Sequence, residues 1–344
     1  MKHLRLFETE TDYDSEVSEF EYPTVSFVQD VEDVRYMLKP PHDYSQDYLT
    51  FEALESGTFT FGTQAQDVRR GNSVYISYSL DNGNTWVQTY LDDLLTSQLD
   101  DLDIVTVTTP TVSAGSKVMW KGWLDRLCYD NIRSTCRFNA SGNVGSIMRG
   151  EEVEDWEYWG QSTYEIDYLF YGTSTLVSAK NLYLDYSYQS NNSTFTCNGF
   201  GSFFYQCTSL TEIPTLPTTL KSGCFSNMFA GCTSLASVPA NLLPATTLAN
   251  NCYRAMFINT ALTTAPELPA TTLVTGCYNN MFERCSSLSY IKAMFTTTPS
   301  NTYTQNWVMN VSSTGTFVKN SAAQWNVTSN YGIPSGWTVE TASE

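Results

Sequence analysis

The strongest constraint on this chain is a motif that recurs through its second half. Three stretches follow one pattern: IPTLPTTLKSGCFSNMFAGCTSL, VPANLLPATTLANNCYRAMFINTAL and APELPATTLVTGCYNNMFERCSSL. Equivalent leucines recur 25 to 27 residues apart, at Leu210, Leu235, Leu262 and Leu288. Such a period is typical of chains that stack one structural unit on the next. Because each unit has a single apolar face, neighbouring units must share one core.

Each unit is predicted to run as strand, proline-bounded turn, short helix and turn. The strand pieces are TEIP, ASVP, TTAP and SYIK, and a Cys-to-Met spacing of four residues places both side chains on one face of a helical turn. An atypical first unit is expected near Leu176, and four aromatic residues, Trp307, Phe317, Trp325 and Trp337, are expected to close the last layer. The predicted repeat core comprises Leu210, Leu235, Leu262, Leu288, Cys224, Cys252, Cys277, Met228, Met256, Met281, Phe229, Phe257 and Phe282.

The chain before the repeats divides into two further segments. Residues 1–44 are acidic, with short strand candidates at 25–28 and 34–37, and they cannot bury enough apolar surface to fold alone. Residues 45–150 read as a β-sandwich-like domain. There LTFEALESGTFTF predicts one hairpin, and SVYISYSL with TWVQTYL predicts a second. Residues 151–344 form the predicted repeat domain with a C-terminal cap.

One hairpin carries a recognisable local motif. The residues Ser79, Asp81, Gly83, Thr85 and Trp86 fit the pattern S-x-D-x-G-x-T-W, which resembles the Asp-box of sialidases. We expect a structural turn, in which Asp81 accepts hydrogen bonds from turn amides and Gly83 supplies a positive φ. The alternative is a sialidase relic, which would need several such boxes and an arginine triad, and neither is visible.

Charge is concentrated in the first half of the chain. Residues 1–170 hold 30 Asp and Glu against 12 Lys and Arg, whereas residues 171–344 hold six of each. An acidic protein lacks the basic footprint of nucleic-acid binding. The negative charge either keeps a β-rich protein soluble or complements a basic partner.

Two acidic runs are candidate sites. LDDLLTSQLDDLD, residues 91–103, predicts a helix with one leucine face, and its carboxylates form either a solvated face or a calcium site. EEVEDWEYW, residues 151–159, marks a domain boundary, and an acid pair there is the less favoured alternative.

Cysteine usage indicates buried thiols rather than a disulfide framework. Nine cysteines are present, an odd number, and seven of them recur at repeat spacing. With only His3 and His42 available, zinc ligation is not expected, and we predict no cofactor and no metal. The sequence shows neither a secretory signal nor an apolar run long enough to span a membrane. We therefore expect that the protein does not insert into a membrane. We expect it to be made in a cytosol and either to stay there or to be released by lysis.

The repeats resemble the BspA-like leucine-rich repeats of surface and phage proteins from gut Bacteroidales. The residues that carry this resemblance run from "CTSL…APELPATTL…CY..MF" to "STGTFVKNSAAQWNV…GIPSGWTV", over about 200–344 and more loosely from 143. The N-terminal "KHLRLFETE…EYPTVSFVQD…VRYM" resembles a short leader of virion proteins in crAss-like phages. The resemblance implies a mainly β chain with short helices: a docking segment, a β-sandwich-like domain and a leucine-rich-repeat solenoid of stacked α/β repeats.

The resemblance also implies a non-enzymatic structural or accessory protein of a virion: a head or tail fibre, or a vertex or capsid decoration. Residues 1–40 are then expected to dock on other virion proteins, through Tyr22, Pro23, Val25, Phe27, Val28 and Tyr36. The repeats would contact a host-surface glycan or protein or serve as a spacer, and a homo-oligomer is expected, a trimer by analogy. The alternatives are a bacterial cell-surface adhesin and a glycan-degrading tail protein.

Overall fold

The computed structural model describes residues 48–65, 74–95, 100, 103–124, 132–149, 168–184, 200–218 and 220–342. The chain divides into two units, and all of these residues lie in the second, Asp47–Glu344. The described residues are mainly β with very few helices, which confirms the coarser part of the expectation. The strands are β1 (Leu49–Ala53), β2 (Phe59–Gln64), β3 (Tyr75–Ser79), β4 (Val87–Tyr90), β5 (Ile104–Thr108), β6 (Lys117–Trp123), β7 (Ile132–Ser134), β8 (Phe138–Asn143), β9 (Leu176–Tyr183), β10 (Tyr290–Ala293), β11 (Thr316–Lys319) and β12 (Thr338–Thr341). The short helical pieces are η2 (Asp92–Leu94), α4 (Ser146–Arg149) and α5 (Asn301–Thr304).

Two sheets pack against each other in the first part of this unit. The larger has the order β4-β3-β6-β1-β8-β9, and the smaller has the order β5-β2-β7. In β1 the residues alternate between buried and half-buried, as a strand with one face on a core requires. Rings from the two sheets meet in that core, with centroids 5.4 Å apart for Phe51 and Phe59 and 5.7 Å apart for Phe61 and Trp120.

Strand β9 belongs to the same sheet as the strands before it. It pairs in parallel with β8, although it lies in the segment that the sequence assigns to the repeats. The predicted boundary at 150/151 falls among residues 150–167, which lie outside the described residues. That boundary stays a prediction.

The hairpin predicted from LTFEALESGTFTF is wrong. β1 pairs with β6 and β8, whereas β2 pairs with β5 and β7, so the link between them crosses from one sheet to the other. Gly57 permits the crossing, because a Cβ at this position would lie 2.6 Å from the Cβ of Cys136. The second predicted hairpin forms, as β3 and β4 pair antiparallel.

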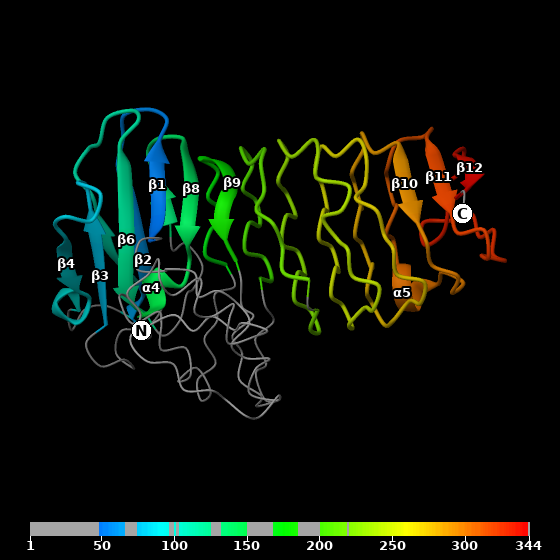
Figure 1. Ribbon diagram of the computed structural model, residues 1–344, viewed down its shortest axis with the longest axis horizontal. Coiled ribbons are helices and arrows are strands. Elements are labelled where there is room, and N and C mark those ends of the chain that lie inside the picture. Colours follow the sequence, from blue (N-terminus) through cyan, green and yellow to red (C-terminus); the bar gives the residue numbers. More distant parts are fainter. Residues whose placement is uncertain are drawn as a thin grey trace, which may run out of the picture. The chain divides into compact units, whose positions relative to one another are not determined.

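Beyond β9 the chain passes through successive layers that reach β10, β11 and β12 in chain order (Figure 1). One side of each layer is extended and the other is a series of tight turns. On the turn side, alternate amides bond within the layer and to the next layer: Ser226 N–H donates to Gly223, whereas Phe225 N–H donates to Cys252. This alternation satisfies the turn-side backbone without a helix. Among the described residues, the backbone-to-backbone bonds between layers on the turn side run from an amide to a carbonyl of the following layer.

The short helix predicted in each repeat is not formed. Asn227, between Cys224 and Met228, has a φ of 57°, which an α-helix cannot include. A left-handed residue recurs at every fourth position of the turns, and interlayer hydrogen bonds take the place of the i to i−4 bonds of a helix. From Gly223 onwards these residues are Gly223, Asn227, Gly231, Asn251, Ala255, Asn259, Gly276, Asn280, Arg284, Asn306 and Asn310, and the two layers before them have Tyr168, Gly172, Ser202 and Gln206 at the same spacing.

The predicted strand pieces are also shorter than expected in most layers. TEIP and TTAP contribute single bridges, at Glu212 and Thr264, and ASVP forms no strand. The last three residues of SYIK lie in β10, whose strand is Tyr290–Ala293. The prolines in the first two pieces remove backbone donors and limit strand pairing.

The layered backbone continues where the repeat sequence stops. Phe282 N–H donates to Trp307 and Arg284 N–H donates to Met309, with N–O distances of 2.8 Å in both cases. β10, β11 and β12 then form a parallel sheet. The four aromatic residues predicted to close the stack are all buried: Trp307, Phe317, Trp325 and Trp337.

Candidate functional site

The Asp-box-like hairpin forms a closed network of local hydrogen bonds. The Oδ1 of Asp81 accepts from the Oγ of Ser79 and the amide of Thr85, both at 2.8 Å, and its Oδ2 accepts from the Oγ1 of Thr85 at 2.6 Å. Gly83 has a φ of 85° and its carbonyl accepts from the Nε1 of Trp86 at 3.0 Å.

This hairpin therefore uses its carboxylate for structure. The hydroxyl of Thr85, then the Thr85 amide and the hydroxyl of Ser79, lower the pKa of Asp81 below its ordinary value of 3.8. A carboxylate held in its charged form by its own turn is poorly suited to act as a general acid. The geometry is that of a turn-stabilising device.

The residues predicted to form the repeat core lie inside the stack. The four leucines, three methionines and three phenylalanines of that set are fully buried, and the three cysteines are at most 5% exposed. Their rings form columns: Phe204, Phe229, Phe257 and Phe282 stack at centroid distances of 5.5 to 5.9 Å. A second column contains Phe200, Phe225, Tyr253 and Tyr278. Because each ring packs on rings of both neighbouring layers, the core is continuous from layer to layer.

The thiols of the repeats are buried and unreactive. Six of the seven repeat cysteines lie among the described residues, and all six are free and buried: Cys207, Cys224, Cys232, Cys252, Cys277 and Cys285. The seventh, Cys197, lies outside the described residues. Burial raises the pKa of Cys224, Cys277 and Cys285 from 9.0 to about 11, so each is protonated at neutral pH. A protonated, inaccessible thiol is a poor nucleophile and a poor metal ligand. Thr260 stands where the neighbouring repeats carry Cys232 and Cys285. Its hydroxyl donates to the carbonyl of Phe257 at 3.0 Å and contacts the Sγ of Cys285 at 3.3 Å.

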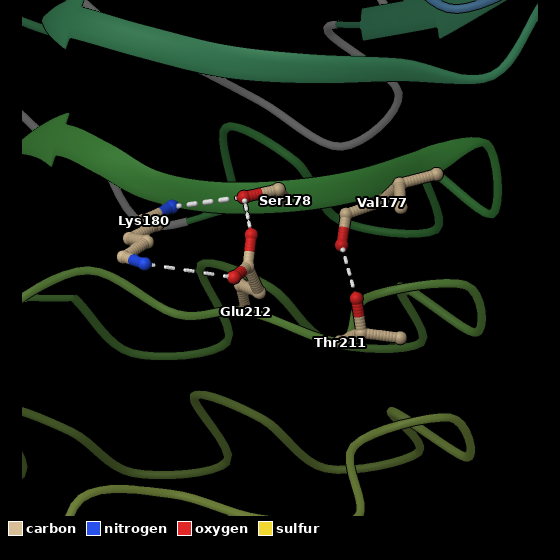
Figure 2. Close-up of polar contacts among 5 residues, drawn as sticks. All are labelled: Val177, Ser178, Lys180, Thr211 and Glu212. Atoms are coloured by element: carbon tan, nitrogen blue, oxygen red, sulfur yellow. Dashed lines mark hydrogen bonds and ion pairs between the residues drawn. The ribbon is translucent and has the colours of Figure 1, made fainter.

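The outer face of the extended side carries polar contacts between layers. Figure 2 shows this face where β9 meets the next layer. Ser178 donates to the Oε2 of Glu212 at 2.7 Å, and the Nζ of Lys180 lies 3.7 Å from the Oε1 of the same carboxylate. Beside them, the Oγ1 of Thr211 donates to the carbonyl of Val177 at 3.1 Å.

The same arrangement recurs farther along the stack. Lys292 pairs with Glu267 at 3.1 Å, and the hydroxyls of Ser289 and Thr296 donate to carbonyls of the preceding layer. The lysine and glutamate charges cancel in pairs, and the Ser289 and Thr296 hydroxyls donate their hydrogen bonds within the protein. The face is therefore close to neutral and offers oxygen lone pairs to a ligand that brings its own donors.

Sequence reasoning missed these interlayer pairs. Lys180 and Glu212 are 32 residues apart, and Lys180 lies in the atypical first unit, so no repeat motif linked them. A signal does exist for Glu267 and Lys292, because their separation of 25 residues equals one repeat period.

Several predicted sites lie wholly or partly outside the described residues. The docking residues Tyr22, Pro23, Val25, Phe27, Val28 and Tyr36 are outside them, as is the acidic run at 151–159. In the run at 91–103, the described part contains the 3-10 turn η2 in place of the start of a longer helix. Within the described ranges, no group of three or more His, Cys, Asp or Glu residues is placed to hold a metal ion.

Comparison with other proteins adds no relative. No protein-family model, curated protein or solved structure matches this chain. None of the helices in the described ranges has the length and apolar character needed to cross a membrane.

Proposed function

We propose that this chain is a non-enzymatic accessory protein of a bacteriophage particle that displays a leucine-rich-repeat solenoid for adhesion to a host-surface glycan or protein. The observation that carries the proposal is the combination of a continuous buried core with a neutral, hydroxyl-rich outer face. Such a combination makes a rigid display element, since repeats of this kind depend on their neighbours for stability.

The solenoid assignment is supported by the regular offset between bonded layers. Phe225 bonds to Cys252, Tyr253 to Cys277 and Tyr278 to Tyr303, at separations of 24 to 27 residues. These offsets match the sequence period. In the aromatic columns, the ring of an inner layer stacks on one ring of the layer before it and one ring of the layer after it, as stacked repeats require.

Adhesion is supported by the chemistry of the outer face. Exposed Thr and Ser residues occur on each of several layers, among them Thr211, Ser237 and Thr264. Neutral glycans present many hydroxyl donors, which complement oxygen acceptors on such a face. A catalytic role would need an activated acid or nucleophile, whereas the described carboxylate and thiols with shifted pKa values are held in structural roles.

Particle attachment is the part of the proposal that rests on the leader resemblance. The test is to express the full chain and a variant lacking residues 1–40 in cells that produce the particles, and to purify the particles by density gradient. We expect mass spectrometry and gold labelling to find the full chain on the particles and to find the variant only in the soluble fraction. Equal recovery of both would contradict docking through this segment.

Adhesion is tested separately with labelled full-length protein on a glycan array and on intact Bacteroidales cells. A Ser237→Glu, Thr264→Glu variant adds charge to the extended face, and an Asn250→Glu, Gln305→Glu variant adds the same charge to exposed positions of the turn side. We expect only the first variant to lose binding. Equal binding by all three proteins would contradict the assignment of this face, and shortening of a capsular polysaccharide by the protein would contradict the non-enzymatic part.

A further inference from the structure

The edge strand β4 is unusual in its side chains. Val87 is 51% exposed and Tyr90 is 46% exposed, and the strand VQTY carries no charge. Two more exposed apolar residues, Leu80 and Leu94, flank it. Edge strands of soluble proteins are usually protected by charges, prolines or bulges, because an open edge pairs with other chains. An edge without charges, with an exposed apolar side chain on each face of the strand, is therefore open to pairing with another chain.

The backbone of β4 leaves one row of amides and carbonyls without a partner among the described residues. β4 pairs only with β3, and it ends the six-stranded sheet (Figure 1). Leu91 N–H donates to Val74 next to β3, so the polar groups of alternate residues from Leu91 backwards point at β3. The backbone groups of Trp86, Gln88 and Tyr90 then point outward.

We propose that β4 is a dimerisation strand, which pairs antiparallel with β4 of a second copy of this chain. A two-fold axis perpendicular to the sheet and passing beside Gln88 sets Gln88 opposite its own symmetry mate. In this register Trp86 lies opposite Tyr90 of the second copy, and Val87 lies opposite Thr89 of the second copy. Every outward-pointing residue then meets another outward-pointing residue, as an antiparallel ladder requires.

The side chains fit this self-pairing as well as the backbone does. The register brings aromatic to aromatic, amide to amide and β-branched to β-branched residues, which are favourable cross-strand pairs. The acidic residues that follow the strand, at 92 and 93, lie in η2 beyond the end of the ladder, so the paired strands oppose no like charges. The second copy satisfies these conditions without any further assumption about its sequence.

The dimer must form against long-range repulsion, because each chain carries a net charge of −18. Salt screens this repulsion at distances beyond about 10 Å at 0.1 M, while it leaves strand pairing intact. The dissociation constant is therefore expected to fall as the NaCl concentration rises. This dependence is opposite to that of a dimer held by ion pairs.

Sedimentation velocity of the full chain over a range of concentrations and NaCl levels tests the proposal. We expect a reversible dimer for the natural sequence. Gln88→Lys and Gln88→Glu each oppose like charges at the two-fold axis, and each is expected to raise the dissociation constant at least about tenfold. A mixture of the two variants is expected to restore association as a heterodimer.

The matched control is Val339→Lys, which adds the same charge to β12, another exposed edge strand whose Val339 is 44% exposed. It is expected to leave the dimer unchanged, and circular dichroism with thermal melting verifies that each variant is folded. A natural chain that is monomeric under all conditions would overturn the proposal. So would a mixture that fails to associate, or loss of the dimer in Val339→Lys with retention in the Gln88 variants.

Discussion

Several polar side chains of the described residues make hydrogen bonds to groups close to them in sequence. Asp81 binds its own turn, and Lys319 donates from its Nζ to the carbonyl of Trp325 at 2.9 Å and to the Oδ1 of Asn326 at 2.7 Å. Each of these residues closes a loop that the rest of the fold needs. The Asp81 carboxylate and the Lys319 ammonium group thus each hold nearby backbone in place.

The Asp81 turn gives a pH-dependent prediction. Asp81→Asn removes the charge that Thr85 and Ser79 stabilise, and we expect the Tm at pH 7 to fall by a few degrees. Because the folded-state pKa of Asp81 is lowered from 3.8, its contribution is present above that value and is lost as the pH falls through the folded pKa. Calorimetry of the natural chain and the variant should therefore show a Tm difference at pH 7 that vanishes in strong acid. Asp93→Asn, at an exposed position, is the control and should leave the Tm unchanged at both pH values.

Within each layer, left-handed residues set the path of the turns. Gly276 has a φ of +66°, and a Cβ there would lie 2.0 Å from the Oδ1 of Asn251 in the preceding layer. Gly115 has a similar φ of +82° but nothing within 4 Å of its Cβ position. Substitutions at the two glycines can therefore be compared to distinguish the cost of backbone strain from the cost of steric conflict between layers.

We expect Gly276→Ala to lower the free energy of unfolding by about 2–4 kcal/mol, the sum of left-handed strain and overpacking. Gly115→Ala should cost only about 1 kcal/mol, from strain alone. Urea unfolding monitored by tryptophan fluorescence measures both. Equal losses would show that the Asn251 side chain turns away from the new methyl group without cost.

The buried thiols predict how stability depends on alkaline pH. The unfolded chain ionises its cysteines near pH 9, whereas the folded pKa of Cys224 and Cys277 is about 11. These thiols therefore contribute stability that is fully present below pH 9 and is lost as the pH rises towards 11. Each adds a slope of up to about 1.4 kcal/mol per pH unit in that window. The doubly substituted Cys224→Ala, Cys277→Ala chain should show a shallower decline in urea unfolding between pH 9 and 10.5, and parallel curves would contradict this account.

The elements differed in how far the sequence could predict them. The β3–β4 hairpin is local, and Asn82 and Gly83 both have positive φ, so the turn itself determines the pairing. The pattern around Gly57 is equally alternating, but its strands join different sheets, because partners such as Trp120 in β6 are remote in sequence. The four-residue spacing of Cys224 and Met228 is compatible both with a helix and with a chain of turns. Only bonds to the next layer distinguish the two.

The described unit as a whole is a chain of coupled layers that starts on a sheet and ends on aromatic residues. The core columns were predictable because Leu, Met and Phe recur at each period. The burial of the closing aromatic residues was predictable too, but the continued layering of the backbone was not, because Trp307 occupies the place of the repeated methionine and the surrounding motif has gone. The recurring left-handed asparagines, Asn306 and Asn310, are the signal that survives there.

Coupling between layers predicts that damage at one end weakens that end first. Trp307 is fully buried and its ring contacts Tyr278 and Phe282 of the preceding layer. We expect Trp307→Ala to cost about 3–5 kcal/mol locally, and hydrogen exchange to accelerate in the layer at 276–284 while β1 stays protected. Mass spectrometry of peptides from both regions measures this, and equal acceleration in β1 would mean that layers and sheets unfold as one.

The one-way direction of the interlayer bonds on the turn side has an electrical consequence. From Phe170 to Arg284, these amides all point towards the following layer, so their peptide dipoles add instead of cancelling. The turn side is thereby polarised along its length, positive towards the aromatic cap, whereas on the extended side amides such as those of Thr211, Ser289 and Thr316 point to the preceding layer and oppose this polarity. The two sides of the stack therefore differ in the direction of their peptide dipoles, and each added repeat would extend that difference.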